Sequence, residues 1–553
     1  MLNIFAGLFL LIAVSSYSPP VDYEMTLAGN FGEPRPNHFH GGIDVKTGGV
    51  EGKPIYSISD GYVSRITTGL YGFGNAVYVT HPDGRTAVYC HLRSFSPSLQ
   101  RLLRRWQYKN ASTNADIRLS ATEYPVARGQ LIAISGNTGA STAPHLHLEL
   151  HETRTWNMTD PLDVLAPFVR DSLPPMAHAF MACPVAGEGV FCGSSAKQSF
   201  PFSSHTLTRT FTAWGKIGLA IWANDYSETT FNHYGVRETI LTVNGREIFR
   251  STVDNIPMLR NRMVNSWGDY DHYFRTGVWF MKSFLSPGTR LPILKTDDDK
   301  GVIDIREERE YHICYTLRDI HGNTSSYSFV IRGERSDITA KKSEASGATP
   351  IRWDKTGMIS LPGMQLVLPS GNLPDDTFIR PTVKEPSDGR YSAVYSFSQR
   401  SFPLFRHAEL SLAVCRKMTD PTKFYIVSHY DRDRFMGGRY ADGWVTADIR
   451  ELGASYELEY DDRPPVISPL SQSSWTTNGI IRLTLADGKS GVKSFRGYID
   501  NLFVLFEQEH RSAIVTCRLK DAPIRKEGRT RRLKFTATDN RDNTATFECD
   551  LIY

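Results

Sequence analysis

The segment 37–44 (NHFHGGID) places a histidine and an aspartate four residues apart. His40 offers a neutral imidazole and Asp44 a carboxylate, and both ligand types suit a divalent transition metal, zinc in particular. On a helix this spacing would put the two side chains on one face, but Gly41 and Gly42 favour a loop that enters a short strand. We therefore expect two ligands of a metal site here, with glycines that let the backbone pass close to the ion.

The segment 144–150 (PHLHLEL) supplies the candidates for a further ligand. Its leucines alternate strictly with polar residues, which predicts a strand with His145, His147 and Glu149 on one face. Two imidazoles then project side by side from a rigid element. His91, at the end of another predicted strand (TAVYCHL), is a further polar candidate. Three protein ligands with an open position are typical of a catalytic zinc site, whereas a structural site is closed.

Four motifs follow one another along the chain: HxxxD at 40–44, YxHL at 89–92, SGNTG at 135–139 and HLH at 145–147. Any one of them is a weak signal, but four in this order are specific. Together they resemble the lysostaphin/LytM-type zinc metallopeptidases, which cut peptide bonds in bacterial cell-wall peptidoglycan. The order and spacing match across about residues 25–165.

The resemblance implies a role for five residues. His40, Asp44 and His147 would bind zinc. His91 and His145 would flank the open coordination position, orient or deprotonate the attacking water, and stabilise the charged intermediate. Many relatives that only regulate other enzymes have lost ligands, whereas this chain has kept all of them.

Other polar residues near the motifs have two readings. His38 and His81 match no family position, and a structural role is favoured for both. Glu149 could hydrogen-bond a ligand imidazole and fix its tautomer, or it could be a carboxylate that faces solvent. An HExxH motif is absent, because no histidine follows at position 155 after His-Glu at 151–152. The general base should therefore be a histidine rather than a helical glutamate.

Residues 1–16 form a short, mostly apolar segment that ends in small residues, which predicts a signal peptide. No Lys or Arg precedes the apolar run, so an uncleaved anchor is the alternative. An exported protein of the periplasm or cell envelope is therefore expected. In such a compartment Cys183 with Cys192, and Cys517 with Cys549, are candidate disulfides. Cys90 is expected to be a small buried hydrophobic residue.

A chain of 553 residues is too long for one domain, and its 40% hydrophobic and 22% charged residues argue against a mostly disordered protein. The net charge of +4 is small, and no nucleic-acid motif is visible, so no nucleic-acid partner is expected. The predicted fold is mainly β, with an antiparallel-sheet LytM-type catalytic domain followed by several immunoglobulin-like β-sandwich domains. The expected divisions are a catalytic domain at 22–165, a β-sandwich at 170–333, a linker at 334–349, a β-rich domain at 350–462 and an immunoglobulin-like sandwich at 463–553.

Two pairs of similar segments suggest that one β-sandwich module is duplicated. SLPP at 172–175 resembles DRPP at 462–465, and DIHGNT at 319–324 resembles DNRDNT at 539–544. The first copy would carry a long insertion around 254–299.

Two further segments are expected near the proposed site. Ser96, Pro97 and apolar residues at helical spacing predict an amphipathic helix within 96–124. This insertion could wall one end of the groove, with its arginines attracting an anionic peptide, or it could be a solvated helix packed at the domain edge. The glycine-rich segment 69–75 predicts a mobile loop, whose Tyr71 and Phe73 could contact substrate or pack in the core.

These features predict a zinc-dependent metalloendopeptidase that hydrolyses peptide cross-links of peptidoglycan. The expected partners are a peptidoglycan peptide as substrate and an envelope protein that could dock on the C-terminal β domains. Two alternatives remain open, which are a zinc protease that processes an envelope protein and a non-hydrolytic regulator or wall-binding protein.

Overall fold

The computed structural model describes residues 16–340, 347–386, 389–397, 403–508 and 511–553, so the predicted signal segment lies outside the described residues except for Ser16. The chain is mainly β, and its buried apolar residues form four large cores. The elements around these cores divide the described chain into four units. They are the N-terminal unit (17–169), the second unit (176–333), the third unit (349–460) and the fourth unit (466–553).

The N-terminal unit is built on an antiparallel sheet with the order β1-β4-β13-β8-β7-β6-β10. Its strands are β1 (Leu27–Gly29), β4 (Gly42–Lys46), β6 (Gly61–Thr67), β7 (Ala76–Thr80), β8 (Arg85–Cys90), β10 (Asp116–Arg118) and β13 (His145–Glu152). A three-stranded sheet packs beside it, made of β5 (Pro54–Tyr56), β12 (Leu131–Ile134) and β9 (Ser94–Phe95). The alternation predicted for 144–150 is confirmed, because Leu146, Leu148 and Leu150 lie in the core of this unit.

The predicted amphipathic helix is α1 (Pro97–Asn110), with Pro97 in its first turn and Leu99 and Leu103 buried. Part of its polar face contacts the fourth unit. The Tyr108 hydroxyl donates to the carbonyl oxygen of Asp521 at 2.7 Å, and Arg104 pairs with Glu507 at 2.8 Å.

The second unit forms one connected sheet whose path is β16-β15-β17-β26-β25-β19-β20-β23. These strands are β15 (Met176–Phe191), β16 (Gln198–Pro201), β17 (Thr206–Tyr226), β19 (Glu238–Val243), β20 (Arg246–Thr252), β23 (Leu294–Thr296), β25 (Glu310–Arg318) and β26 (Thr324–Gly333). The long insertion contains η2 (Met258–Met263), α3 (Val264–Trp267) and α4 (Tyr270–Thr276). It returns to the N-terminal unit, where the Asn261 side chain accepts from the backbone N–H of Phe39 at 2.6 Å.

The third and fourth units each consist of two sheets that share one core. In the third unit, the sheet β28-β29-β33-β37-β36 contains β28 (Gly357–Leu361), β29 (Met364–Leu368), β33 (Pro403–Ala413), β36 (Arg439–Ala441) and β37 (Trp444–Glu451). Its partner sheet β31-β32-β38-β34-β35 contains β31 (Thr382–Lys384), β32 (Val394–Ser396), β34 (Phe424–His429), β35 (Asp433–Phe435) and β38 (Ser455–Tyr460).

The fourth unit has the sheets β39-β40-β44-β43 and β42-β41-β45-β46, with β39 (Val466–Pro469), β40 (Ile480–Ala486), β41 (Val492–Ile499), β42 (Leu502–Val504), β43 (Glu507–Gln508), β44 (Ile514–Arg518), β45 (Thr530–Asp539) and β46 (Thr544–Ile552).

The two similar turns have the same local structure. In the second unit, the N–H and the side-chain amide of Asn323 donate to the Asp319 carboxylate at 2.8 and 2.7 Å. In the fourth unit, Asn543 donates to Asp539 in the same way, at 2.9 and 2.7 Å. Each turn joins two paired strands, β25 to β26 and β45 to β46, which supports the predicted repeat.

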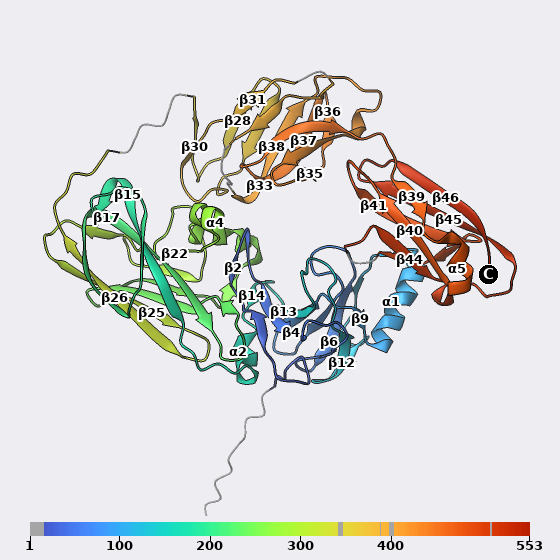
Figure 1. Cartoon of the computed structure of the whole chain (residues 1–553), viewed down its shortest axis with the longest axis horizontal. Helices are drawn as coiled ribbons and strands as arrows, with labels where there is room; N and C mark the ends of the chain where they lie inside the picture. The colour runs from blue at the N-terminus through green and yellow to red at the C-terminus, as the bar shows by residue number, and fades with distance from the viewer. Residues whose placement is uncertain (1–15, 341–346, 387–388, 398–402, 509–510) are drawn as a thin grey trace, which may run out of the picture.

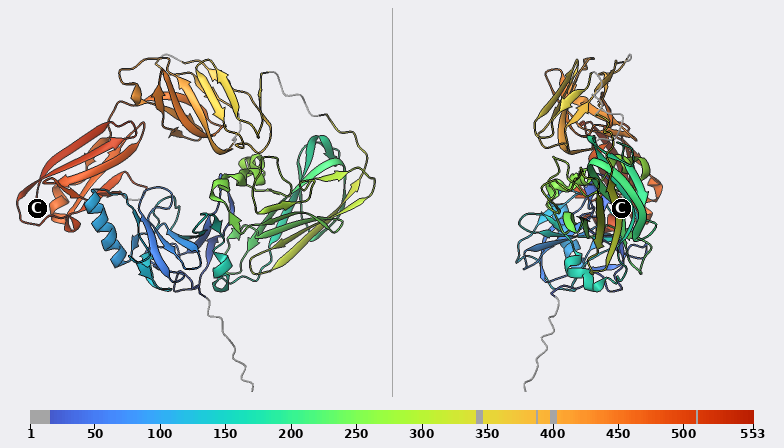
Figure 2. Two further views of the ribbon diagram at one scale, coloured as in Figure 1. Left: turned by 180° about the vertical axis from the view of Figure 1, so that it is seen from behind. Right: turned by 90° about the vertical axis from the view of Figure 1, so that its left-hand side faces the viewer.

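The four units follow one another around a ring (Figure 1), which is narrow when it is seen edge-on (Figure 2). Hydrogen bonds join the neighbours: Asn30 to the carbonyl of Gly235, Arg262 to that of Leu404, and Arg541 to that of Phe424. The contacts of α1 with the fourth unit complete the ring.

The predicted disulfides are wrong, because all seven cysteines of the chain are unpaired. Cys183 and Cys192 lie too far apart along an extended segment, and Cys517 and Cys549 extend toward one core from its two sheets without forming a bond. Cys90 is fully buried, as predicted. Among the described residues, no helix combines the length and the apolar character that crossing a membrane requires.

Candidate metal centre

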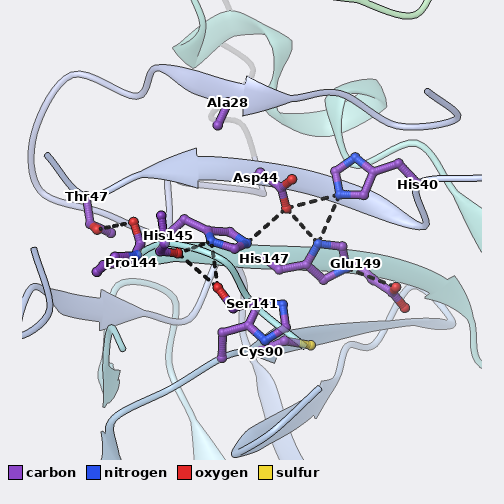
Figure 3. A network of polar contacts seen from close by, with 12 residues as sticks. Ala28, His40, Asp44, Thr47, Cys90, Ser141, Pro144, His145, His147 and Glu149 are labelled. Carbon is purple, nitrogen blue, oxygen red and sulfur yellow. Dashed lines mark hydrogen bonds and ion pairs between the residues drawn. The ribbon is translucent and has the colours of Figure 1, made fainter. Parts of the chain in front are cut away.

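Strand pairing brings together the residues that the motifs singled out. His147 on β13 lies opposite Asp44 on β4 and opposite Cys90 on β8, so His91 follows β8 at the same level of the sheet. His40 precedes β4 and reaches Asp44 from the adjoining loop. Figure 3 shows the side chains of His40, Asp44, His145 and His147 turned toward one another on one side of the sheet.

Three donor atoms converge within this group. His40 Nε2 and His147 Nδ1 lie 3.0 and 2.8 Å from the same Asp44 oxygen, Oδ1, and the two ring nitrogens are 3.0 Å apart. A tetrahedral zinc ion with bonds of about 2.0–2.1 Å holds its ligand atoms roughly 3.3 Å apart. The side chains are nearly inaccessible, with His40 only 2% exposed. Two imidazoles and a carboxylate at this spacing fit a zinc ion.

His91 and His145 lie beside the three donors. His145 Nε2 is 3.3 Å from Asp44 Oδ1, and the His91 ring lies 5.0 Å from that of His145 and 5.6 Å from that of His147. Both rings are held through Nδ1, which lies 2.8 Å from a backbone carbonyl oxygen, of Thr138 for His91 and of Ala143 for His145. Since a carbonyl oxygen only accepts, Nδ1 carries a proton in each ring, and Nε2 is the nitrogen that faces the site.

The backbone of His91 is strained, with φ at 59° in the left-handed region. Such a conformation costs on the order of 1 kcal/mol for a residue with a Cβ atom. It is held by the His91 N–H, which donates to the carbonyl of Phe73 at 2.9 Å. The strain places the ring over the site instead of along the strand.

Burial and neighbouring charges set the protonation of the group. Burial lowers the pKa of His40 to about 4, and burial together with the charges of His147 and His145 lowers the pKa of His91 to about 4. Burial alone would raise the pKa of Asp44, but the charge of His40 and hydrogen bonds from the histidines hold it well below its usual range. At neutral pH the carboxylate is charged, while His40 and His91 are neutral.

Glu149 does not face solvent. It is 4% exposed, and its Oε1 lies 3.0 Å from His147 Nε2. Its other oxygen lies 2.6 Å from Nε2 of His151, whose ring stacks on Trp156 at 4.4 Å. Burial lowers the pKa of His147, but its hydrogen bonds to Asp44 and Glu149 raise it overall to about 9. Because Glu149 accepts from Nε2, it would leave Nδ1 to a metal ion.

Gly41 and Gly42, in the first motif, allow the backbone to pack closely against β13. A Cβ atom on Gly42 would lie 2.1 Å from the carbonyl oxygen of Leu148, and one on Gly41 would lie 2.5 Å from the Glu149 carboxylate. We predicted that these glycines let the backbone pass close to the ion. The contacts that they permit are with β13 and the Glu149 carboxylate, so the prediction is refined.

Sequence reasoning missed two contributors to the site. Arg35 Nη2 donates to the second oxygen of Asp44 at 2.9 Å, which leaves Oδ1 to the histidines. Met258 and Asn261, from the insertion of the second unit, line the groove above the site. Arg35 could have been suspected as a lone basic residue just before the first motif, but nothing in the sequence relates 258–261 to His40.

The groove that contains the site measures about 960 Å³. Phe73 lines it and lies 6.1 Å from the His147 ring, whereas Tyr71 is 85% exposed and lies outside it. His38 also borders the groove, while His81 lies elsewhere. None of the residues that line the groove comes from α1, so the prediction that this helix walls the groove is wrong.

Comparisons with known proteins agree with this arrangement. Residues 38–102 match Peptidase family M23, and residues 348–461 match the Zu5-like domain. Over 112 residues, or 20% of this chain and 18% of the relative, the sequence is 33% identical to an uncharacterized metalloprotease of Haemophilus influenzae. It is 31% identical over 110 residues to the DD-carboxypeptidase/endopeptidase Mpg of Neisseria meningitidis, covering 20% of this chain and 19% of that protein.

A third relative is the peptidoglycan DD-endopeptidase ShyA of Vibrio cholerae, which is 32% identical over 138 residues, 24% of this chain and 26% of the relative. The chain thus matches only about a fifth to a quarter of the length of these curated relatives. Among solved structures, the catalytic domain of lysostaphin from Staphylococcus simulans aligns with 26% identity and a TM-score of 0.19, covering 25% of this chain and 89% of that domain.

Proposed function

Because the chain carries a peptidase family M23 domain, we propose that it is a zinc-dependent metalloendopeptidase that hydrolyses the peptide cross-links of bacterial peptidoglycan. The observation that carries this proposal is the convergence of His40, Asp44 and His147 beside two further histidines in an open groove. Three protein donors with free space next to them are the arrangement of a catalytic zinc site.

His40 Nε2, Asp44 Oδ1 and His147 Nδ1 would hold the zinc ion. Bound there, zinc supplies Lewis acidity, which polarises a scissile carbonyl and lowers the pKa of a water to ~7. Arg35 and Glu149 keep the ligands in place, since one occupies Asp44 Oδ2 and the other fixes the tautomer of His147.

His91 and His145 are the proposed catalytic bases. Each ring is anchored through Nδ1, so Nε2 is placed to accept a proton from the attacking water and return it to the leaving amine. Once protonated, either imidazolium stabilises the negative charge that develops on the carbonyl oxygen. The low pKa of His91 ensures that it begins the reaction without a proton.

The proposed substrate is a peptidoglycan peptide. The walls of the groove come from β1, the loop after β4, the segment 140–144 and the insertion. Two of the similar proteins are named as peptidoglycan or DD-endopeptidases, which supports the same substrate class here.

Location and domain roles form part of the same proposal. Such a substrate requires export to the periplasm or cell envelope, consistent with the signal segment or anchor at 1–16. The later β domains, with the boundaries given above, would position the enzyme or dock an envelope protein.

The experiment is digestion of purified peptidoglycan by residues 17–553 with mass spectrometry of the released fragments. Wild type should release cross-link fragments, His147→Ala should release none, and Glu51→Gln, a change at an exposed carboxylate, should match wild type. If wild-type protein with bound zinc releases nothing from the wall but cleaves an envelope protein, the substrate class is wrong. If it cleaves neither, the chain is a regulator or a wall-binding protein.

A further inference from the structure

A second group of acidic and histidine side chains lies where the N-terminal unit meets the second unit. Asp171 follows the last helical turn of the N-terminal unit, η1 (Ala166–Phe168), Asp225 lies near the end of β17, and Asp319 and His321 follow β25. Segments distant in the sequence therefore bring four potential metal ligands to one junction.

The donor atoms are close and face one another. One ligand atom each from Asp171, Asp319 and His321 lie within 4.8 Å of one another, and His321 Nδ1 is 3.8 Å from Asp171 Oδ2. His321 Nε2 lies 3.2 and 3.0 Å from the carbonyl oxygens of Ala166 and Val169, so this nitrogen carries the proton. Nδ1 therefore presents a lone pair, and it is buried with no hydrogen-bond partner.

Asp225 gives an independent indication. It is 6% exposed, and its Oδ1 is buried and has no hydrogen-bond partner. Together with Asp171 and His321 it borders a small cavity of about 20 Å³, which has room for a single water or ion.

Arg237 borders the same cavity, but its guanidinium is paired with Asp160 and Asp163. Within the described ranges, no Lys or Arg forms an ion pair with Asp171, Asp225 or Asp319. Buried charges in proteins are paired or coordinate metals, because an isolated one is costly.

We propose that a second divalent metal ion, of the zinc or manganese class, binds between Asp171, Asp225, Asp319 and His321. The imidazole lone pair favours a transition metal over calcium, which takes six to eight oxygen ligands and needs more space. The ion ties the chain that leaves the N-terminal unit to the ends of β17 and β25. The inference is independent of the proposed peptidase activity.

The repeat in the fourth unit supplies a natural comparison. Asp461, Asp487 and Asp539 form the equivalent cluster, but Arg541 stands where the second unit has His321. The carboxylates are also satisfied from the backbone: Ser490 N–H donates to Asp461 at 3.1 Å, and Gly491 N–H donates to Asp487 at 2.7 Å. Arg541 donates to the carbonyl oxygens of Phe424 and Gly438 in the third unit, and a guanidinium has no lone pair to offer, so the cluster in the fourth unit lacks the nitrogen ligand that His321 provides.

The test is a count of bound metal in the full chain. Protein stripped with EDTA is loaded with zinc or manganese chloride alone, passed through a desalting column, and analysed by mass spectrometry of the metal. Wild type should retain two zinc ions per chain and His147→Ala one. The double variant His147→Ala with His321→Arg should retain none, because arginine cannot offer the lone pair of the His321 imidazole to a metal. Asp298→Asn, at an exposed acid, is the control and should retain two.

The same proteins give a second readout in thermal unfolding. Zinc should raise the Tm of His147→Ala, and adding His321→Arg should remove that increase, measured for each protein as the difference between its zinc-loaded and metal-free forms. Asp225→Asn in the His147→Ala background should also lose the last zinc ion. The proposal is overturned if His147→Ala retains no metal, or if the double variant with His321→Arg still retains one.

Discussion

Replacing Glu149 with glutamine should weaken zinc binding about 10- to 100-fold, because Glu149 holds the ring of the proposed ligand His147. Its Oε1 accepts from His147 Nε2 at 3.0 Å in a site from which water is excluded. Glutamine keeps the shape but loses the charge, and its amide end cannot satisfy both His147 and His151. The expected loss corresponds to about 1.4–2.7 kcal/mol of binding free energy.

The assay is competition for zinc against a fluorescent chelator at neutral pH. All proteins carry His321→Arg, so that only the site of His147 is measured. Glu51→Gln is the matched control, since it makes the same chemical change at an exposed position. Equal zinc affinity of the Glu149→Gln and Glu51→Gln proteins would refute the role that we assign to this carboxylate.

Three further predictions concern catalysis, stability and the thiols. His91→Ala and His145→Ala should each lower the rate of cross-link cleavage by about 10²–10⁴-fold while the protein keeps its zinc, and loss of zinc in either would instead make that histidine a ligand. Burial raises the pKa of Asp160 to about 6, above its ordinary 3.8, so the folded state holds this proton more tightly than the unfolded chain. The free energy of unfolding should therefore fall, on the order of 3 kcal/mol, from about pH 4 to about pH 6, and urea titrations of Asp160→Asn should lack this fall. In the native protein a thiol reagent should label exposed Cys415 quickly and Cys517 slowly, because burial raises the pKa of the latter to about 12, and seven thiols should react after denaturation without reductant. Fewer than seven would mean that a disulfide forms.

The candidate site could be predicted from the sequence because its residues lie in short motifs whose local pattern sets their geometry. Strict alternation in 144–150 places both histidines on one strand face whatever that strand pairs with, and the structure confirms this face. The motifs also selected the five residues that lie together in the groove. Amphipathic spacing was sufficient for α1 for the same reason.

The remaining features depend on contacts between segments that are distant in the chain. Glu149 could have faced solvent or a ligand, and only the pairing of β13 with β4 and β8 buries its face. The insertion reaches the groove through Asn261, and α1 contacts the fourth unit through Tyr108, although neither residue carries a recognisable motif. Disulfides were predicted from the cellular compartment and the spacing, but the extended strand β15 holds Cys183 and Cys192 apart, which their spacing in the sequence does not reveal.

The central claim is that His40, Asp44 and His147 hold a zinc ion, and anomalous diffraction at the zinc edge tests it most directly. Crystals of the full chain grown with zinc would be measured on both sides of the edge. The account predicts an anomalous peak bonded by His40 Nε2, Asp44 Oδ1 and His147 Nδ1, with His91 and His145 close by but not bonded to it. A zinc-loaded crystal with no peak among these three atoms, or with the ion held by other residues, would contradict it.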